Sequence, residues 1–322
     1  MGLHAGTPVR YDATAVRLGF GDLPEAVRAE IAAHLGGPPV TVRSAGGGFT
    51  GGFAAVVTSG TGRCMFVKAT GPDLPFVVDA YSREAHNNTA LPDTVPSPRM
   101  RFSAQVHDWV VLGFDAVDGT APALPLTVAQ WRLMLDAWAR AAEALTPAPE
   151  PLRALGIPHM TGRGLHHFTD VAAGTTPPDP LPPLAVTHLT ALAELEAVMP
   201  RAVAADAVTH GDLRPDNMIL TGDRALICDW TALEVAACWF DTIALLIVAH
   251  GEGHDADTWL RRHPTVAGVT DEQIDSVLAA ITGYYLVNSG RPPIDRVSPH
   301  LRAHQRWNGL AALDWLASRR GW

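Results

Sequence analysis

The sequence predicts an α+β fold with two lobes, a small β-rich N-terminal lobe over residues 1–118 and a larger helical lobe over residues 119–322. Short runs of β-branched and aromatic residues occur mainly in the first third of the chain, whereas apolar residues at helical spacing dominate the rest. Of the 322 residues, 47% are hydrophobic and 18% are charged. This composition indicates a substantial buried core and argues against a disordered chain.

The first lobe begins with a predicted helix over residues 22–35, in which Asp22 is the candidate N-cap and Gly36 follows the last turn. Several β-like runs come next, and two of them flank a Ser-Gly-Thr-Gly turn that is typical of a hairpin. A second helix and a further strand complete the lobe. We expect strands at residues 40–43, 53–58, 65–69 and 109–112, and the second helix at residues 78–91.

The second lobe is expected to be mostly helical. Residues 128–145 place Trp131, Trp138 and further apolar side chains on one helical face. Residues 146–184 are rich in Pro, Gly and His and predict an irregular excursion. Helical patterns return at residues 185–199 and from residue 236 onward, and between them a hairpin is expected with strands at residues 217–220 and 225–229.

Charge and cysteine content restrict the class of protein. The net charge of −9 argues against a general nucleic-acid binder, which usually carries a basic face. The three cysteines form no disulfide framework and no zinc-binding spacing. The N-terminus does not resemble a signal peptide, and the apolar run at residues 243–249 is too short to span a membrane. We therefore expect a cytoplasmic protein with no nucleic-acid or membrane partner, and its oligomeric state stays open.

A glycine-rich segment, SAGGGFTGG at residues 44–52, contains Gly46, Gly48 and Gly51 in a G-x-G-x-x-G pattern. Glycine allows backbone amides to approach phosphate oxygens closely. A dinucleotide-binding fold requires a helix directly after the glycines, but strand-like residues follow here. A Walker-type loop requires Gly-Lys, which is absent. The alternatives that remain are a glycine-rich β-hairpin over a nucleotide, as in kinases, and a flexible surface loop.

Lys68 is the one lysine among 24 basic residues, and it lies at the end of a predicted strand. A compact ammonium can contact two phosphate oxygens in a way that a planar guanidinium does not reproduce. Glu84, sixteen residues later in a predicted helix, is the carboxylate expected to hold that ammonium. The alternative reading of Glu84 is a solvated charge on the helix surface.

Residues 208–220 (VTHGDLRPDNMIL) and 225–230 (ALICDW) carry the most specific pattern. Asp212 follows His-Gly, Asn217 lies five residues later, and Asp229 ends an apolar strand. In phosphoryl transfer such an aspartate orients the substrate hydroxyl, and the other two side chains supply oxygen ligands to Mg²⁺. The alternative is an acidic loop beside a hairpin.

Over residues 35–245, THGDLRPDNMIL, ICDW, the glycine loop and Lys68 together resemble the aminoglycoside phosphotransferase family. The resemblance implies a two-lobed protein-kinase-like fold and the use of ATP or GTP with Mg²⁺. By this resemblance Asp212 is the catalytic aspartate, Asn217 and Asp229 are metal ligands, and Lys68 binds phosphate with Glu84 as its partner.

The same resemblance assigns roles to three further positions. In VVLGFDAVDG, the backbone at Asp115 and Val117 is expected to pair with the nucleotide base. Asp241 matches the aspartate that braces the catalytic loop. Arg214 occupies the place where protein kinases have a lysine near the transferred phosphate, so it either stabilises charge there or is a solvated arginine.

The segment after Asp229 is too short for a regulated activation segment and contains no Ala-Pro-Glu, which favours a small-molecule kinase over a protein kinase. The expected reaction is transfer of a γ-phosphate to a hydroxyl of a small-molecule acceptor. Two alternatives stay open: a kinase of a metabolite alcohol or sugar (choline-, homoserine- or sugar-kinase-like), and a non-catalytic nucleotide-binding relative.

The charge distribution suggests a cationic acceptor of aminoglycoside type. Residues 1–118 hold 9 basic and 11 acidic side chains (net −2), whereas residues 119–322 hold 15 and 22 (net −7). Residues 252–275 alone contain six carboxylates against Arg261 and Arg262. A negative surface attracts cationic ligands. The alternative is that these carboxylates keep an exposed pair of helices soluble.

Overall fold

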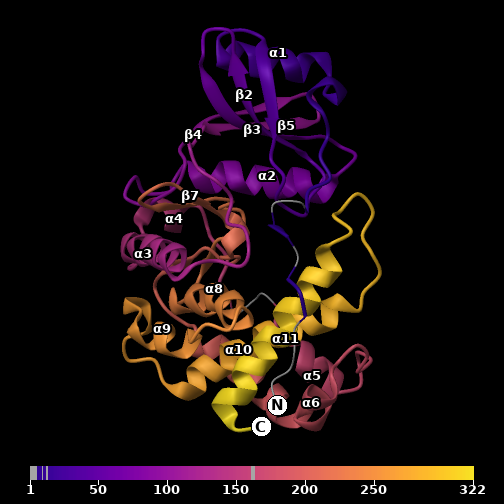
Figure 1. Cartoon of the computed structure of the whole chain (residues 1–322), viewed down its shortest axis with the longest axis vertical. Coiled ribbons are helices and arrows are strands. Elements are labelled where there is room, and N and C mark those ends of the chain that lie inside the picture. Colours follow the sequence, from indigo (N-terminus) through magenta and orange to yellow (C-terminus); the bar gives the residue numbers. More distant parts are fainter. Residues whose placement is uncertain (1–5, 9, 12–13, 161–163) are drawn as a thin grey trace.

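The computed structural model describes residues 6–8, 10–11, 14–160 and 164–322. A β-sheet with two helices forms one end of the molecule, and helices make up most of the other end (Figure 1). The predicted α+β fold class, with a β-sheet in the N-terminal region and a mostly helical C-terminal part, is confirmed.

The N-terminal lobe is built on a five-stranded antiparallel sheet in the order β1-β2-β3-β5-β4. Two helices pack on it and bury separate apolar clusters. The elements are β1 (Pro39–Ser44), β2 (Phe53–Ser59), β3 (Cys64–Thr70), β4 (Met100–Val106), β5 (Trp109–Asp115), α1 (Glu25–Leu35) and α2 (Pro75–Asn88).

Strand β5 shows how both faces of the sheet become buried. Val111 belongs to the cluster that contains α1 residues such as Ile31, whereas Leu112 belongs to the cluster that contains Tyr81 of α2. Successive side chains of a strand point to opposite faces, so helices on both faces require the continuous apolar run that β5 has. This arrangement places α2 directly against the strands that line the site.

Two sequence predictions in this lobe are wrong. The first helix begins at Glu25 rather than at Asp22, because Asp22 lies in a 3₁₀ turn and accepts a hydrogen bond from the Gly19 amide at 2.8 Å. Strand β4 was not predicted. It is an edge strand that pairs with β5 alone, and its polar side chains weaken the β pattern.

The helical lobe contains α3 (Val128–Ala144), α4 (Glu150–Ala154), α5 (His167–Ala172), α6 (Pro183–Thr187), α7 (Leu189–Ala202), α8 (Trp239–Gly251), α9 (Ala256–Arg262), α10 (Asp271–Ser289) and α11 (Leu301–Arg320). A single apolar cluster joins most of these helices and includes Trp131, Trp138, Trp239 and Trp315. Trp138 also donates from Nε1 to Thr242 Oγ1 at 3.0 Å, which ties α3 to α8.

The predicted irregular excursion at residues 146–184 includes residues 161–163, which lie outside the described part. The described remainder is more ordered than the sequence predicts, because it contains α4, α5 and the start of α6. Glu196 of α7 holds α5 in place: its carboxylate accepts the amides of Phe168 at 3.1 Å and Thr169 at 2.8 Å. A buried carboxylate that satisfies the free amides of a helix start is a tertiary contact that local composition does not reveal.

Two small antiparallel pairs lie in the helical lobe, next to the sheet. Strand β6 (Val208–Thr209) pairs with β9 (Glu234–Val235), and β7 (Met218–Leu220) pairs with β8 (Ala225–Ile227). The segments that join these strands carry the strongest sequence motif. No helix in the described part of the chain is long and apolar enough to cross a membrane.

The first described residues contact the helical lobe, although they precede the sheet in sequence. Trp307 of α11 donates from Nε1 to the Gly6 carbonyl at 3.2 Å, and the Tyr11 ring packs edge-on against His304. From there the chain rises to the sheet (Figure 1). The N-terminal segment therefore contacts both lobes.

Candidate active site

A cavity of about 730 Å³ lies between the two lobes. Its walls come from the glycine loop (residues 45–52, between β1 and β2), from β3, α2 and β5, and from residues 212–230 of the helical lobe. Five predicted site residues that are distant in sequence line it together: Lys68, Glu84, Asp212, Asn217 and Asp229.

Lys68 joins the two lobes electrostatically. Its Nζ donates to both carboxylate oxygens of Glu84, at 2.8 and 2.7 Å, and lies 3.6 Å from Asp229 Oδ1. Burial alone would lower the pKa of Lys68, but the carboxylates of Asp229 and Glu84 outweigh it and raise the pKa. The ammonium is therefore charged at neutral pH and lies at the cavity wall.

The glycines of the predicted loop serve different purposes. Gly46 and Gly48 line the cavity. Gly48 has a φ of 98°, and a Cβ there would lie 2.5 Å from the Arg17 guanidinium, so a side chain is excluded by both conformation and space. Gly51 instead approaches the helical lobe, where a Cβ would lie 2.5 Å from the Arg296 carbonyl oxygen.

Arg17 braces the glycine loop and was missed by the sequence reasoning. Its Nη2 donates to the Gly47 carbonyl at 2.6 Å, and its Nη1 donates to the Thr50 carbonyl at 2.8 Å. Its Nε is buried, and the described residues offer it no hydrogen-bond partner. Arg17 lies 30 residues before Gly47 in no recognisable motif, so no local signal marks it.

Two further segments hold the same loop from either side. The Ala15 amide donates to the Gly46 carbonyl at 2.9 Å, and the Ser298 amide donates to the Phe49 carbonyl at 2.8 Å. Ser298 Oγ also donates to the Thr14 carbonyl at 2.5 Å, which joins the two bracing segments to each other. The glycine loop is thus fixed by the N-terminal segment and by the α10–α11 connection.

The loop at residues 210–217 depends on a glycine and an aspartate. Gly211 has a φ of 76°, and a Cβ there would lie 2.0 Å from the Ala232 carbonyl oxygen. Asp241 of α8 accepts the amides of His210 at 2.7 Å and Gly211 at 3.0 Å. His210 Nε2 donates to the Cys228 carbonyl at 2.9 Å, and burial lowers the pKa of this histidine, so its ring is neutral. These contacts fix the backbone that carries Asp212.

Asp212 is held by two neighbours from its own loop. Arg214 Nη1 donates to Asp212 Oδ1, and Asn217 Nδ2 donates to the Asp212 carbonyl at 2.8 Å and to Oδ2 at 3.3 Å. Arg214 also binds Asp216 through two hydrogen bonds of 3.0 Å. Burial alone would lower the pKa of Arg214, but Asp212 and Asp216 raise it. Arg214 is therefore a fixed cation beside Asp212 rather than a solvated arginine.

The oxygens of Asn217 and Asp229 fit a divalent cation. Because Asn217 Nδ2 donates to Asp212, its carbonyl oxygen is left as the ligand atom. Asp229 lines the cavity with a φ of 63° and accepts a hydrogen bond from Thr231 Oγ1 at 2.5 Å. One carboxylate and one amide oxygen, completed by phosphate oxygens, form a donor set that Mg²⁺ prefers.

Asp115 and Val117 line the cavity at the connection between the lobes. The Asp115 amide donates to the Arg99 carbonyl at 2.9 Å, and its carboxylate binds Arg101 at 2.6 and 2.7 Å. The backbone amide of Asp115 is thus already used within the sheet. That amide is therefore not available to a base, so a base contact by the Asp115 amide, as the resemblance implies, would need this hydrogen bond to break.

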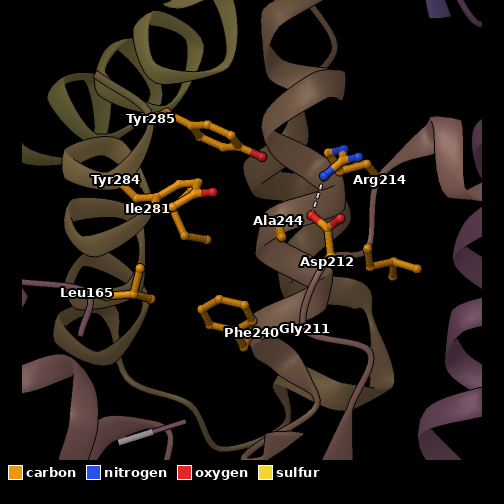
Figure 2. A pocket seen from close by; sticks show the side chains of 10 residues that line it. Leu165, Gly211, Asp212, Arg214, Phe240, Ala244, Ile281, Tyr284 and Tyr285 are labelled. Carbon is orange, nitrogen blue, oxygen red and sulfur yellow. Dashed lines mark hydrogen bonds and ion pairs between the residues drawn. The ribbon is translucent and has the colours of Figure 1, made fainter. Parts of the chain in front are cut away.

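A second, smaller pocket of about 50 Å³ opens beside Asp212 and Arg214. Figure 2 shows the Tyr285 hydroxyl directed toward Arg214, with Ile281 and Leu165 on the same side of the space as Tyr285 and Phe240 at its lower end. Sequence reasoning missed this pocket. Its walls come from α8, α10 and the segment before α5, which share no motif.

A family model and several solved structures relate this chain to known proteins. A family model described as the phosphotransferase enzyme family (APH) matches residues 55–273. Among curated proteins, none matches the sequence.

Solved structures are similar in fold. The GDP complex of aminoglycoside 2'-phosphotransferase-IIIa matches with a TM-score of 0.62 and 15% identity over 92% of this chain and 100% of its own. Spectinomycin phosphotransferase APH(9)-Ia, in complex with ADP and spectinomycin, matches with a TM-score of 0.59 and 11% identity over 90% of this chain and 98% of its own. Macrolide 2'-phosphotransferase MphH from Brachybacterium faecium gives 0.54 and 18% over 90% and 98%.

Proposed function

This chain belongs to the phosphotransferase enzyme family, as its motifs predicted, and from that premise we propose that it transfers the γ-phosphate of ATP or GTP to a hydroxyl of a small molecule. One observation carries the proposal. Lys68 with Glu84, Asp229, Asn217 and Asp212 line one cavity, in the combination of cation, metal ligands and base that phosphoryl transfer requires.

Each residue has a role that follows from its contacts. Lys68, fixed by Glu84, binds phosphate oxygens together with the amides of the glycine loop. Mg²⁺ held by Asn217 and Asp229 would neutralise charge on the phosphates. Asp212 orients the acceptor hydroxyl and takes its proton, and Arg214 beside it stabilises negative charge on the transferred group. Asp115 and Val117 contact the base through their backbone.

A direct test combines the purified protein with Mg²⁺ and γ-labelled ATP or GTP, in separate reactions, over aminoglycosides, amino alcohols, sugars and apolar alcohols. We expect label in an acceptor, and we expect EDTA to abolish transfer. Binding of Mg·nucleotide without transfer or hydrolysis in any reaction would favour the alternative of a non-catalytic relative. The braced 210–217 loop argues against that alternative, because a scaffold has no need of a fixed Asp212.

The expectation of a cationic, aminoglycoside-like acceptor loses its main support. Of the six carboxylates at residues 252–275, three form a network with arginines: Asp257, Asp271 and Asp275 bind Arg319. Glu252 accepts from the Leu126 amide and from Trp131 Nε1, both at 3.0 Å. Among the described residues that line the two pockets, none of the six appears. Four of the six carboxylates are thus engaged within the fold, and the six lie outside the pockets in which an acceptor would meet Asp212.

A further inference from the structure

The small pocket beside Asp212 has a volume of about 50 Å³, enough for the hydroxyl-bearing end of a ligand that extends beyond it. Asp212 and Arg214 line both this pocket and the large cavity between the lobes. A compound in the small pocket and a nucleotide in the large cavity can therefore reach the same carboxylate. A shared base beside both ligands is what transfer to a positioned hydroxyl requires.

The chemistry of the pocket wall is mostly apolar and aromatic. Asp212, whose charge is opposed by Arg214, is the one acid among the described residues that line it. Tyr284 and Tyr285 present aromatic rings with hydroxyl groups. The remaining side chains are aliphatic or aromatic: Leu165, Leu213, Phe240, Ala244 and Ile281.

The rim of the pocket beside Tyr284 is formed by His167. The His167 ring packs edge-on against the Tyr284 ring, with 5.7 Å between centroids, and its Nε2 lies 3.3 Å from Asn288 Nδ2. Burial lowers the pKa of His167, and the charge of Arg291 lowers it further. The His167 ring beside Tyr284 is therefore neutral at pH 7, although the Asp170 carboxylate opposes part of the effect of Arg291.

We propose that the acceptor is an uncharged hydroxyl compound with an apolar or aromatic face, which packs against Tyr284 and Phe240 and directs its hydroxyl to Asp212. This inference rests on the proposed function and deepens it. In the step, the acceptor oxygen bonds to the γ-phosphorus and its proton passes to Asp212. The bond from that phosphorus to the bridging oxygen breaks, and the nucleoside diphosphate leaves with the electron pair.

A polycationic acceptor fits this wall poorly. It would lose hydration against Arg214 and the apolar side chains without gaining a carboxylate besides Asp212 among the described lining residues. An apolar face, in contrast, is favoured mainly by the Tyr284 ring that it covers, because Tyr284 is 39% exposed whereas Phe240 and Ile281 are nearly buried. The aromatic rings also offer stacking surfaces for a flat ligand.

The acceptor class is tested with three sets of compounds at equal concentration, using Mg·ATP and Mg·GTP and a mass readout. The sets are neutral compounds with an apolar face (chloramphenicol, phenyl and alkyl glycosides, macrolactones), neutral hydrophilic compounds (free sugars, polyols), and polycations such as kanamycin. We expect the highest kcat/KM within the first set, at least 10-fold above the other two. A best substrate from either other set, or no turnover above water hydrolysis in the first set, overturns the proposal.

A pair of variants links the result to this wall. Tyr284 is 39% exposed, so Tyr284→Asp is expected to fold. It should raise the KM of the best acceptor about 10-fold or more while leaving the nucleotide KM unchanged, because an acid replaces an apolar contact. Val128→Asp on α3 is the control, since Val128 is 43% exposed and lies outside both pockets. An unchanged acceptor KM in Tyr284→Asp contradicts the proposed contact.

Failure of this inference is distinguishable from failure of the proposed function. If kanamycin is phosphorylated and the first set is not, phosphoryl transfer stands and the acceptor class is wrong. If nucleotide is bound but neither transferred nor hydrolysed under any condition, the proposed function itself fails, and the acceptor proposal fails with it.

Discussion

The two sides of Asp212 are built from opposite kinds of chemistry. Toward the sheet, Lys68, Glu84 and Asp229 form a charged group held by hydrogen bonds of 2.7–2.8 Å and an ion pair of 3.6 Å. Toward α10, Tyr284, Tyr285 and aliphatic side chains form a wall without such a group. Phosphate chemistry is the same for every acceptor, so it demands fixed residue types. The side toward α10, where we propose that the acceptor binds, would have to match one ligand, and its residues share no motif.

The largest effect is expected where the two sides meet. Asp212→Asn keeps the size of the side chain but removes the proton acceptor, so turnover should fall by about 10²–10⁴. The nucleotide Kd should stay within a few-fold, because the contacts of Lys68 and Glu84 do not involve Asp212. Calorimetry with Mg·nucleotide and steady-state assays measure the two quantities.

Asp93→Asn is the matched control, because the Asp93 side chain is fully exposed and lies away from both pockets. It should behave as wild type in both assays. If Asp212→Asn also turns over within a few-fold of wild type, Asp212 is not the base. The nucleotide side and the acceptor side then do not meet at this residue.

A smaller but still large effect is expected for the charged side. Lys68→Arg places a wider, delocalised cation where a compact ammonium binds Glu84, so kcat/KM should fall about 30-fold or more. Because Lys68 is the one lysine of the chain, an amine-directed acyl-phosphate nucleotide probe should label it and the N-terminal amine alone. Saturating ATP or GTP should protect Lys68.

Arg63→Lys supplies an internal control for that probe, since residue 63 is exposed in the β2–β3 turn. The new lysine should react weakly and without protection by nucleotide. Labelling of Lys68 that ATP and GTP both leave unchanged would show that its ammonium does not face the phosphates.

The sequence predicts the charged side of Asp212 much better than the side toward α10. Lys68, Glu84, Asp212, Asn217 and Asp229 were predicted because their types and spacings are dictated by phosphate and metal chemistry, and the structure brings them to one cavity. The sheet and most helices were predicted from their periodicity, with errors at the edge strand β4 and at the start of α1.

The remaining parts are made by tertiary contacts between segments without a motif. Arg17 reaches the glycine loop from 30 residues upstream, and Ser298 reaches it from the other end of the chain. Tyr284 and Phe240 become neighbours in the small pocket through the packing of α10 and α8. The charge of residues 252–275 was read correctly, but its neutralisation by Arg319 depends on the position of α11.

Arg17 offers a test of whether the glycine loop needs its brace. Arg17→Ala removes the donors to the Gly47 and Thr50 carbonyls, so the loop should lose its fixed shape and the nucleotide KM should rise about 10-fold. Arg17→Lys keeps the charge but not the fork of donors, so it should restore little of the loss. Full recovery by lysine would mean that charge, and not loop geometry, is what Arg17 supplies.

The control for this pair is Arg83→Ala, which removes an exposed arginine of α2 outside both pockets. The acceptor KM should change less than the nucleotide KM in Arg17→Ala, because the brace lies on the nucleotide side. Equal changes in the acceptor KM and the nucleotide KM of Arg17→Ala would show that the brace does not act on the nucleotide side alone.

The smallest effect concerns a buried histidine behind the acceptor side. His304 is 3% exposed, and burial lowers its pKa from 6.5 to about 3, with a further contribution from Arg214. The unfolded chain binds a proton near pH 6.5 that the folded protein excludes, so the free energy of unfolding decreases as pH falls below that value. Between pH 7 and roughly pH 5.7 this group should lower the free energy of unfolding by about 1 kcal/mol.

Urea unfolding at the two pH values measures this change. The decrease in the free energy of unfolding should be smaller by that amount in His304→Gln than in wild type. His300→Gln, at an exposed position, should show the same decrease as wild type. An equal loss in wild type and His304→Gln would show that His304 accepts a proton in the folded state, and that this side of Asp212 tolerates buried charge after all.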